Sequence, residues 1–187
     1  MDLMEAIYGR RSIRKYTAEP VPQESITKLL EAAALAPSAS NSQPWSFAVI
    51  QGQERLRQYS DRSKALFLQW FAGKPDPQGY QKALSQPDFN IFYQAGTLII
   101  IYNTLGSEAP MAAGDCCLAA QNLMLAAHGM GLGTCWIGFA ALLMNDPAFK
   151  EELEIPRDHQ GIAPIILGYP ETVPDSYTRK PLQVVWK

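Results

Sequence analysis

Four cationic side chains lie within six consecutive positions near the N-terminus of the sequence: Arg10, Arg11, Arg14 and Lys15, with the hydroxyl of Ser12 among them. A guanidinium presents a planar fork of donors that binds two phosphate oxygens together, and a hydroxyl can donate to the same anion. A phosphate-binding site is therefore one interpretation of the cluster, and it needs support from other parts of the chain. A solvated basic turn that only keeps the chain soluble is the simpler interpretation, and charge alone favours it.

A second stretch, from 37 to 45, is rich in groups that form hydrogen bonds. It places Ser38 and Asn41 between the prolines at 37 and 44. Loops with so many hydroxyl and amide groups often bind ligands. A simple connection between a helix and a strand is the alternative, although most such connections are shorter.

Side chains for acid–base, nucleophilic or metal chemistry are scarce. The histidines are His128 and His159, without a His-Glu-x-x-His pattern, and Cys116, Cys117 and Cys135 do not have metal-ligand spacing. The sequence also lacks a Gly-x-Ser-x-Gly elbow and a Gly-x-x-x-x-Gly-Lys phosphate loop. We predict no metal site and no catalytic side chain. If the protein is an enzyme, a cofactor carries the reaction.

The composition is that of one soluble domain covering 1–187, with 47% apolar and 18% charged residues. A net charge of −2 argues against a sequence-independent nucleic-acid binder, which would need a broad basic face. Neither a bilayer-spanning run nor a signal peptide is evident, so we expect no membrane partner and a cytoplasmic location. The cysteines are expected to be buried thiols in that reducing compartment.

Apolar spacing predicts the elements that position these stretches. We expect helices over 2–8, 23–35, 53–70, 110–128 and 147–154, and strands over 45–51, 96–103 and 160–167. The helix at 110–128 is apolar on every side, which predicts that a subunit interface covers one side of it. Glycines and prolines from 73 to 88 predict an excursion with at most a short helix, a candidate lid. The segment 170–187 has no core of its own and is expected to pack on another surface, such as a second subunit.

Four motifs taken together resemble the nitroreductase family of flavin mononucleotide (FMN) enzymes. They occur at 10–16, 37–45, 131–138 and 179–182, in the family's order and spread along the whole chain. The resemblance implies an α+β fold with a mixed, mainly antiparallel sheet flanked by helices. It also implies an intertwined homodimer with two FMN sites at its interface, in which each C-terminal arm, 170–187, crosses onto the partner.

The resemblance assigns the basic residues to the polar end of FMN. Arg10, Arg11 and Ser12 would contact the phosphate and the ribityl chain, and Arg179 would join them at the phosphate. Arg14 would approach the pyrimidine edge of the flavin ring. The resemblance thus favours the phosphate-binding interpretation of the cluster over the solvated turn.

The other two motifs would contact FMN from different chains. The residues expected from the partner subunit are Pro37, Ser38 and Asn41. The residues whose backbone would lie along the flavin ring near its N5 nitrogen are Trp136, Ile137 and Gly138.

The implied activity is an NAD(P)H-dependent oxidoreductase. Hydride from NADH or NADPH would reach FMN and then a small aromatic acceptor, of the nitroaromatic or quinone type, by a ping-pong mechanism. One alternative is a flavin-binding storage or sensor protein without efficient NAD(P)H turnover, because 73–88 matches no flavin-contacting motif of the family. A structural dimerisation module whose arginines only solubilise is a third hypothesis.

Overall fold

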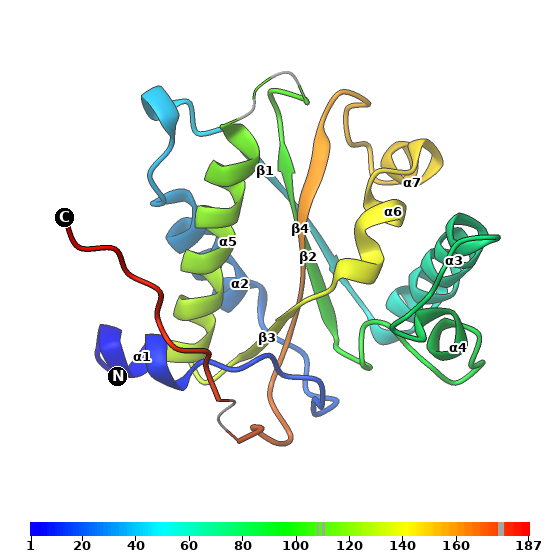
Figure 1. Ribbon diagram of the computed structural model, residues 1–187, viewed down its shortest axis with the longest axis horizontal. Helices are drawn as coiled ribbons and strands as arrows, with labels where there is room; N and C mark the ends of the chain where they lie inside the picture. Colours follow the sequence, from blue (N-terminus) through cyan, green and yellow to red (C-terminus); the bar gives the residue numbers. More distant parts are fainter. Residues whose placement is uncertain (108, 110, 176–177) are drawn as a thin grey trace.

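Four strands form one sheet in the computed structural model, which describes residues 1–107, 109, 111–175 and 178–187. They are β1 (Trp45–Gln51), β2 (Thr97–Asn103), β3 (Gly133–Trp136) and β4 (Gln160–Gly168), arranged in the order β1-β2-β4-β3 (Figure 1). Each pair of neighbours is antiparallel. An isolated parallel bridge links Ser12 to Thr134 at the β3 edge. The predicted mainly antiparallel sheet is therefore confirmed.

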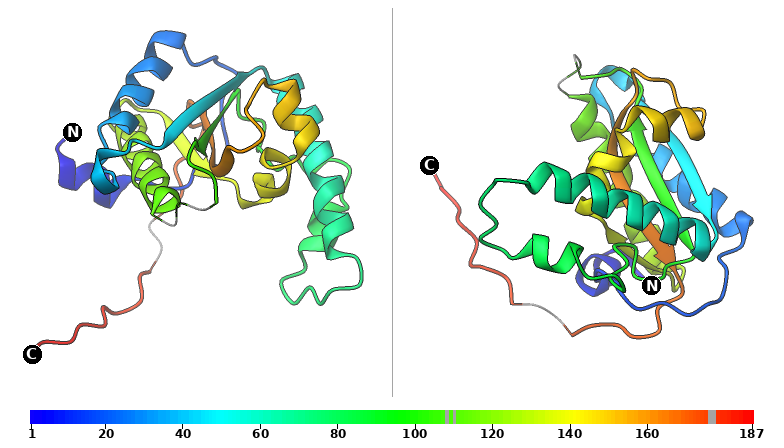
Figure 2. Two further views of the ribbon diagram at one scale, coloured as in Figure 1. Left: turned by 90° about the horizontal axis from the view of Figure 1, so that it is seen from above. Right: turned by 90° about the vertical axis from the view of Figure 1, so that its right-hand side faces the viewer.

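Helices cover both faces of this sheet (Figures 1 and 2). One face carries α1 (Leu3–Gly9), α2 (Gln23–Ala34) and α5 (Ala112–Gly129). The other carries α3 (Gln53–Phe71), α4 (Tyr80–Leu84), α6 (Ala141–Met144) and α7 (Pro147–Glu152). Two short 3-10 turns, η1 (Ala39–Asn41) and η2 (Gly138–Ala140), complete the described elements. The predicted α+β architecture is confirmed.

The central strand β2 shows why the sheet needs both helical layers. All its residues are buried: Leu98 and Ile100 pack towards α3, while Ile99 and Ile101 pack towards α5. A strand covered on both faces has a continuous apolar sequence instead of an alternating one. The two hydrophobic cores hold the sheet in place, and its edge strand β3 contacts other segments of the chain.

Most predicted elements lie within two residues of their observed bounds, and the excursion at 73–88 contains only the short helix α4. Strand β3 and helix α6 were not predicted. Strand β3 is short and glycine-rich, and it is stabilised by pairing with β4, which local sequence does not reveal. Within the described residues, no helix is long and apolar enough to cross a membrane.

The outer side of α5 is exposed in the single chain. Leu118 is 47% exposed and Cys117 is also exposed, so the prediction that Cys117 is buried is wrong for the isolated chain. Cys116 and Cys135 are buried, as predicted. The described part of the C-terminal arm, 170–175 and 178–187, contains no helix or strand. Its first residue, Pro170, forms an isolated bridge with Tyr16 of the same chain, and the arm then projects from the body of the protein (Figure 2).

Candidate functional site

The N-terminal basic segment lies along the edge strand β3. Ser12 pairs with Thr134, and the backbone N–H of Ile13 donates to the carbonyl of Thr134 at 2.9 Å. A Cβ at Gly133 would lie 2.7 Å from the Ile13 side chain, so only glycine allows this close approach. The fold thus brings the first and third predicted motifs together, although they are more than a hundred residues apart in sequence.

A group of arginines gathers beside this contact. The Arg10 guanidinium is partly buried, and burial lowers its pKa, as do the charges of Arg179 and Arg11. Ion pairs among the described residues involve other cations, namely Lys28, Arg62, Lys64 and Arg157. The arginine cluster, which we define as Arg10, Arg11 and Arg179, therefore has no carboxylate partner in the described part of the chain. Such a cluster favours an anion.

One neighbour of the cluster was not predicted as a site residue. His128 is in the last turn of α5, and its Nε2 atom would lie 2.8 Å from a Cβ at Gly9. Burial lowers the pKa of His128, and the charges of Arg10 and Arg11 lower it further. The sequence offered no local signal for this placement, because it depends on α1 packing against the far end of α5.

A cavity of about 130 Å³, which we call the β3 pocket, opens next to the arginines. Its lining residues come from three segments: Arg14, Ile91, Tyr93, Cys135, Trp136, Ile137, Gly138 and Phe139. The Arg14 guanidinium carbon is 5.7 Å from the centroid of the Tyr93 ring, so a cation stands at one side of the pocket. Burial raises the pKa of the Cys135 thiol.

The β3 pocket adjoins a larger apolar hollow of about 620 Å³, which we call the aromatic hollow. The two share Gly138 and Phe139. The Phe139 ring meets Phe67 of α3 edge-on at 5.5 Å and Tyr80 of α4 edge-on at 5.3 Å. The excursion at 73–88 thus supplies an aromatic wall beside the β3 pocket.

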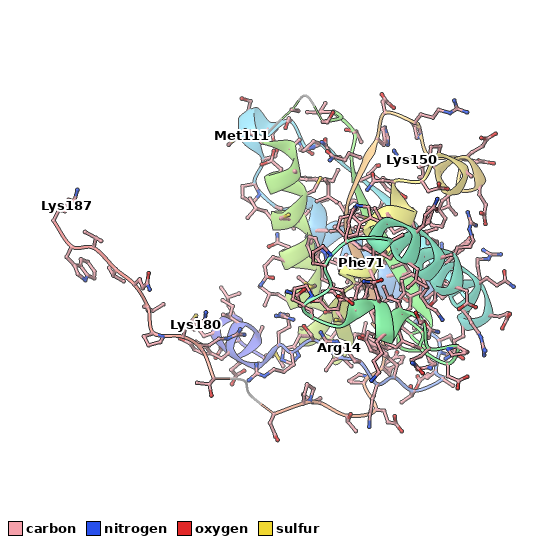
Figure 3. The ribbon with its side chains drawn as sticks, turned by 45° about the vertical axis from the view of Figure 1, so that its right-hand side comes forward. Arg14, Phe71, Met111, Lys150, Lys180 and Lys187 are labelled. Carbon is pink, nitrogen blue, oxygen red and sulfur yellow. The ribbon has the colours of Figure 1, made fainter. Side chains whose placement is uncertain are left out.

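The remaining predicted residues lie elsewhere. Pro37, Ser38 and Asn41 are in or next to the η1 loop, whose Ala39 N–H donates to Asp115 in the first turn of α5 at 3.1 Å. The arginine cluster lies near the other end of α5, and a helix of 18 residues is about 27 Å long. Figure 3 shows Met111, just before α5, far from Lys180, which follows Arg179. A single chain therefore does not bring the η1 loop to the arginines.

The η1 loop is held in an unusual backbone conformation. Ser40, Asn41 and Gln43 have φ values of 52°, 54° and 44°. Left-handed conformations are costly for residues other than glycine, and they cluster at binding and catalytic sites. The loop thus has the character of a preorganised binding element, although the arginine cluster of its own chain lies near the other end of α5.

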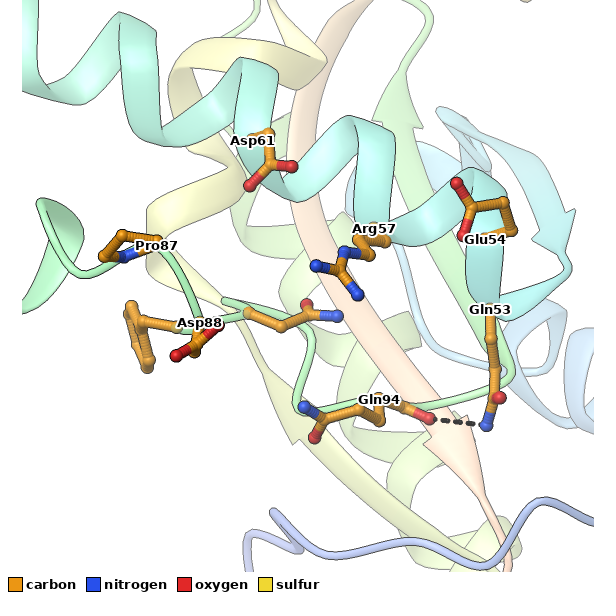
Figure 4. Close-up of a pocket in the computed structure, with 9 residues that line it drawn as sticks. Gln53, Glu54, Arg57, Asp61, Pro87, Asp88 and Gln94 are labelled. Atoms are coloured by element: carbon orange, nitrogen blue, oxygen red, sulfur yellow. Dashed lines mark hydrogen bonds between the residues drawn. The ribbon is translucent and has the colours of Figure 1, made fainter.

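A further pocket, of about 370 Å³, lies between α3 and the segment 87–94 (Figure 4). Glu54, Arg57, Asp61 and Asp88 give it a polar lining, and Gln53 donates to the Gln94 carbonyl at 3.0 Å across it. It contains none of the predicted site residues. The pocket leaves a gap between part of 87–94 and helix α3.

Fold and site together define an α+β protein with a cluster of arginines at one sheet edge beside a small pocket. The model of the nitroreductase family matches residues 7–169, and the chain belongs to that family. It is 32% identical over 174 residues to a Methanothermobacter thermautotrophicus protein provisionally assigned as an NADH dehydrogenase/NAD(P)H nitroreductase, covering 93% of this chain and 80% of the relative. It is 30% identical over 185 residues to an FMN reductase [NAD(P)H] of Bacillus subtilis, covering 96% of this chain and 69% of the relative.

A solved structure supports the same family assignment. The crystal structure of a nitroreductase with bound FMN from Bacteroides fragilis superposes with a TM-score of 0.84, at 28% identity, covering 99% of each chain. The resemblance inferred from the four sequence motifs is therefore confirmed at the level of family and fold.

Proposed function

We propose that this protein is a cytoplasmic, NAD(P)H-dependent FMN oxidoreductase that reduces a small aromatic acceptor. The observation that carries the proposal is the arginine cluster without a carboxylate partner in the described chain, placed beside the β3 pocket. Two relatives whose names include NAD(P)H, and a similar structure with bound FMN, support it. Thiols at Cys116, Cys117 and Cys135 are compatible with a reducing compartment.

The arginine cluster fits the phosphate of FMN. Besides burial, which lowers the pKa of Arg10 most, Arg179 and Arg11 lower it because their positive charges repel its own. A phosphate carries roughly two negative charges and accepts paired hydrogen bonds from guanidinium groups, so it would relieve this repulsion. Ser12, beside Arg11 in the segment that lines β3, would add a hydroxyl donor.

The β3 pocket suits the edge of a planar ring. Trp136, Ile137 and Gly138 line it, and Arg14 stands at its side. A fixed cation there would stabilise negative charge on the pyrimidine side of the ring and would raise the potential of the flavin. When bound, FMN supplies hydride transfer from NADH or NADPH to the acceptor. We propose that the two substrates use the site in turn, which gives ping-pong kinetics.

A second copy of the chain would complete the site. We propose that the chain is a single domain, 1–187, and that two copies pack through the exposed sides of their α5 helices. Antiparallel packing of these helices places the Ser38 and Asn41 of one chain next to the arginine cluster of the other, because the two groups lie at opposite ends of α5. The C-terminal arm, in which Leu182 is 91% and Trp186 is 90% exposed, would pack on the partner.

The aromatic hollow supports an aromatic acceptor of the nitroaromatic or quinone type. Its walls are rings from α3, α4 and η2, and it shares Gly138 and Phe139 with the β3 pocket. Aromatic walls favour planar aromatic ligands through edge and face contacts. A molecule in this hollow would lie next to the proposed flavin position.

The visible spectrum of the purified protein tests the proposal. We expect a yellow protein with flavin absorbance that bleaches when NADH or NADPH is added without oxygen, and recovers when a nitroaromatic or quinone is added. A colourless protein that does not take up added FMN would contradict the proposal. Tight FMN binding without bleaching by either nucleotide would instead indicate a flavin-storage or sensor protein.

A further inference from the structure

Three buried polar side chains lie on one side of α3. Ser60 and Ser63 are fully buried, and Lys64 is 8% exposed. Positions separated by three and four residues share one face of a helix, and the buried face of an amphipathic helix is normally apolar. Buried polar groups are unfavourable unless they are hydrogen-bonded. We refer to these three residues as the α3 polar row, and their partners explain why they are polar.

The two serines hold backbone groups of the β3 pocket. The Ser60 hydroxyl accepts from the Ile91 N–H at 3.0 Å, and the Ser63 hydroxyl donates to the Phe139 carbonyl at 2.5 Å. Ile91 and Phe139 both line the β3 pocket, whereas the serines do not. The hydroxyls therefore act on the pocket through the two segments that form its lining.

Lys64 binds the backbone just before Ile91. Its ammonium donates to the carbonyls of Gln86, Pro87 and Phe89 at 3.2, 3.4 and 3.0 Å. It also contacts the Asp61 carboxylate at 3.1 Å, although that side chain is 59% exposed. Backbone carbonyls of one short segment are thus the main surroundings of a nearly buried charge.

The segment 86–94 needs this support because it contains no helix or strand. Tyr93 and Gln94 have left-handed φ values of 52° and 55°. Part of its side towards α3 borders the polar pocket shown in Figure 4 instead of packed side chains. Tyr93 from this segment carries the ring over which Arg14 lies, so a shift of the segment would move the cation as well as the pocket lining.

We propose that the α3 polar row consists of positioning residues for the flavin ring: it holds segments 86–93 and 137–139 at a set separation and thereby fixes the width of the β3 pocket. This inference rests on the proposed function, because that function assigns the flavin ring to the pocket. The row acts through hydrogen bonds to backbone and does not itself touch the ring.

The first test compares Lys64→Met with a matched control, Lys150→Met. Lys150 is 7% exposed and likewise donates to backbone carbonyls, those of Arg157 and His159, but it lies on α7 away from Arg14 (Figure 3). Both changes keep the side-chain stem and remove the ammonium. Hydrogen–deuterium exchange of the flavin-free protein should be faster at 86–94 in Lys64→Met and faster at 137–140 in Ser63→Ala, because each variant removes the group that holds that segment. It should be unchanged there in Lys150→Met.

The second test measures the flavin itself. Loss of a buried hydrogen-bonding group should weaken FMN binding by about fivefold, and the visible circular dichroism of bound FMN should change. Lys150→Met should leave both as in the wild type. If Lys64→Met does not fold, Ser63→Ala removes a single hydroxyl and carries the same comparison.

Unchanged exchange at both segments would overturn the inference, as would faster exchange accompanied by wild-type FMN affinity and dichroism. A wild-type protein that binds no FMN would instead overturn the proposed function. In that case the exchange comparison would still decide whether the row holds the two segments.

Discussion

At the scale of single residues, the main feature is positive charge that gathers without a carboxylate partner in the described chain. Burial lowers the pKa of Arg10, and the positive charges of Arg179 and Arg11 lower it further, because like charges in the cluster repel one another. Repulsion of this kind costs stability unless an anion is bound. The cluster is therefore better explained by a ligand than by solubility, which scattered surface charges would provide equally well.

We expect Arg179→Ala to weaken FMN binding by about 2–4 kcal/mol, mostly because the phosphate would then be buried with too few cations. Arg157→Ala is the control, because Arg157 is 81% exposed and pairs with Glu151 on α7. Isothermal titration with FMN measures the difference. A loss below roughly tenfold for Arg179→Ala would argue against direct contact with the phosphate.

His128 makes the stability of the flavin-free protein depend on pH. Burial and the charges of Arg10 and Arg11 lower its pKa in the folded state, so the unfolded chain binds a proton more readily. Stability then rises with pH through the window that ends near the ordinary histidine pKa of about 6.5. Urea denaturation between roughly pH 5 and pH 7 should show this rise in the wild type and a smaller rise in His128→Gln.

Bound FMN provides the control for this effect. A phosphate beside Arg10 and Arg11 offsets the charges that lower the pKa of His128, so saturating FMN should reduce the contribution of His128 to the pH dependence. Identical pH profiles for wild type and His128→Gln, with and without FMN, would contradict the placement of the imidazole next to the arginines.

At the scale of elements, the length of α5 sets the distance between the η1 loop and the arginine cluster of one chain. Its first turn holds the η1 loop through Asp115, and its last turn places His128 near the arginines. The Asp115 side chain is 7% exposed, so its hydrogen bond to the Ala39 N–H is shielded from water. This bond anchors a loop with several left-handed residues, which would otherwise have many alternative conformations.

We expect Asp115→Ala to release the η1 loop and to weaken FMN binding by about fivefold, which corresponds to the loss of one buried hydrogen bond. Asp115→Asn keeps a carbonyl oxygen as acceptor and should recover most of the affinity. Both variants lose a carboxylate that favours the N-terminus of α5, so both should show a lower melting temperature, and the fall should be larger for Asp115→Ala because it also loses the hydrogen bond. Equal FMN affinities for the two variants would show that the loop does not depend on this bond.

The sequence predicted which residue types belong to the site, but it did not predict how far apart they lie in one chain. The types of residue at 10–14 and 37–41 indicated binding, because arginine forks and dense hydroxyls are chemical signals that do not depend on the fold. Their positions at opposite ends of α5 depend on helix packing, which local periodicity does not encode. The same limit explains why strand β3 was not predicted. A glycine such as Gly133 is typical of a turn in sequence, and only the fold shows that the Ile13 side chain packs against it.

At the scale of the whole molecule, the exposed apolar surface indicates what the single chain lacks. The outer side of α5 presents Leu118, and the arm presents Leu182 and Trp186. Exposed apolar surface of this kind marks interaction sites in soluble proteins. The apolar helix at 110–128 and the C-terminal segment without a core of its own both predict an interface with a second subunit. That second subunit is part of the proposed function.

If two α5 helices face each other, a charge at the middle of the exposed side would meet its own copy. We therefore expect Leu118→Glu to dissociate the proposed dimer, because two like charges would be buried together in the interface. Each monomer would then keep its arginine cluster but lose the partner's η1 loop, so dissociation and loss of FMN should occur together. Analytical ultracentrifugation with absorbance at both protein and flavin wavelengths measures the two quantities in one experiment.

The matched control is Ala148→Glu, which introduces the same charge at an exposed position of α7, on the opposite face of the sheet. This variant should remain dimeric and yellow. A Leu118→Glu monomer that still binds FMN with wild-type affinity would show that one chain suffices for the site. Such a result would contradict the shared site while leaving the assignment of the arginines intact, because Arg179→Ala tests them independently.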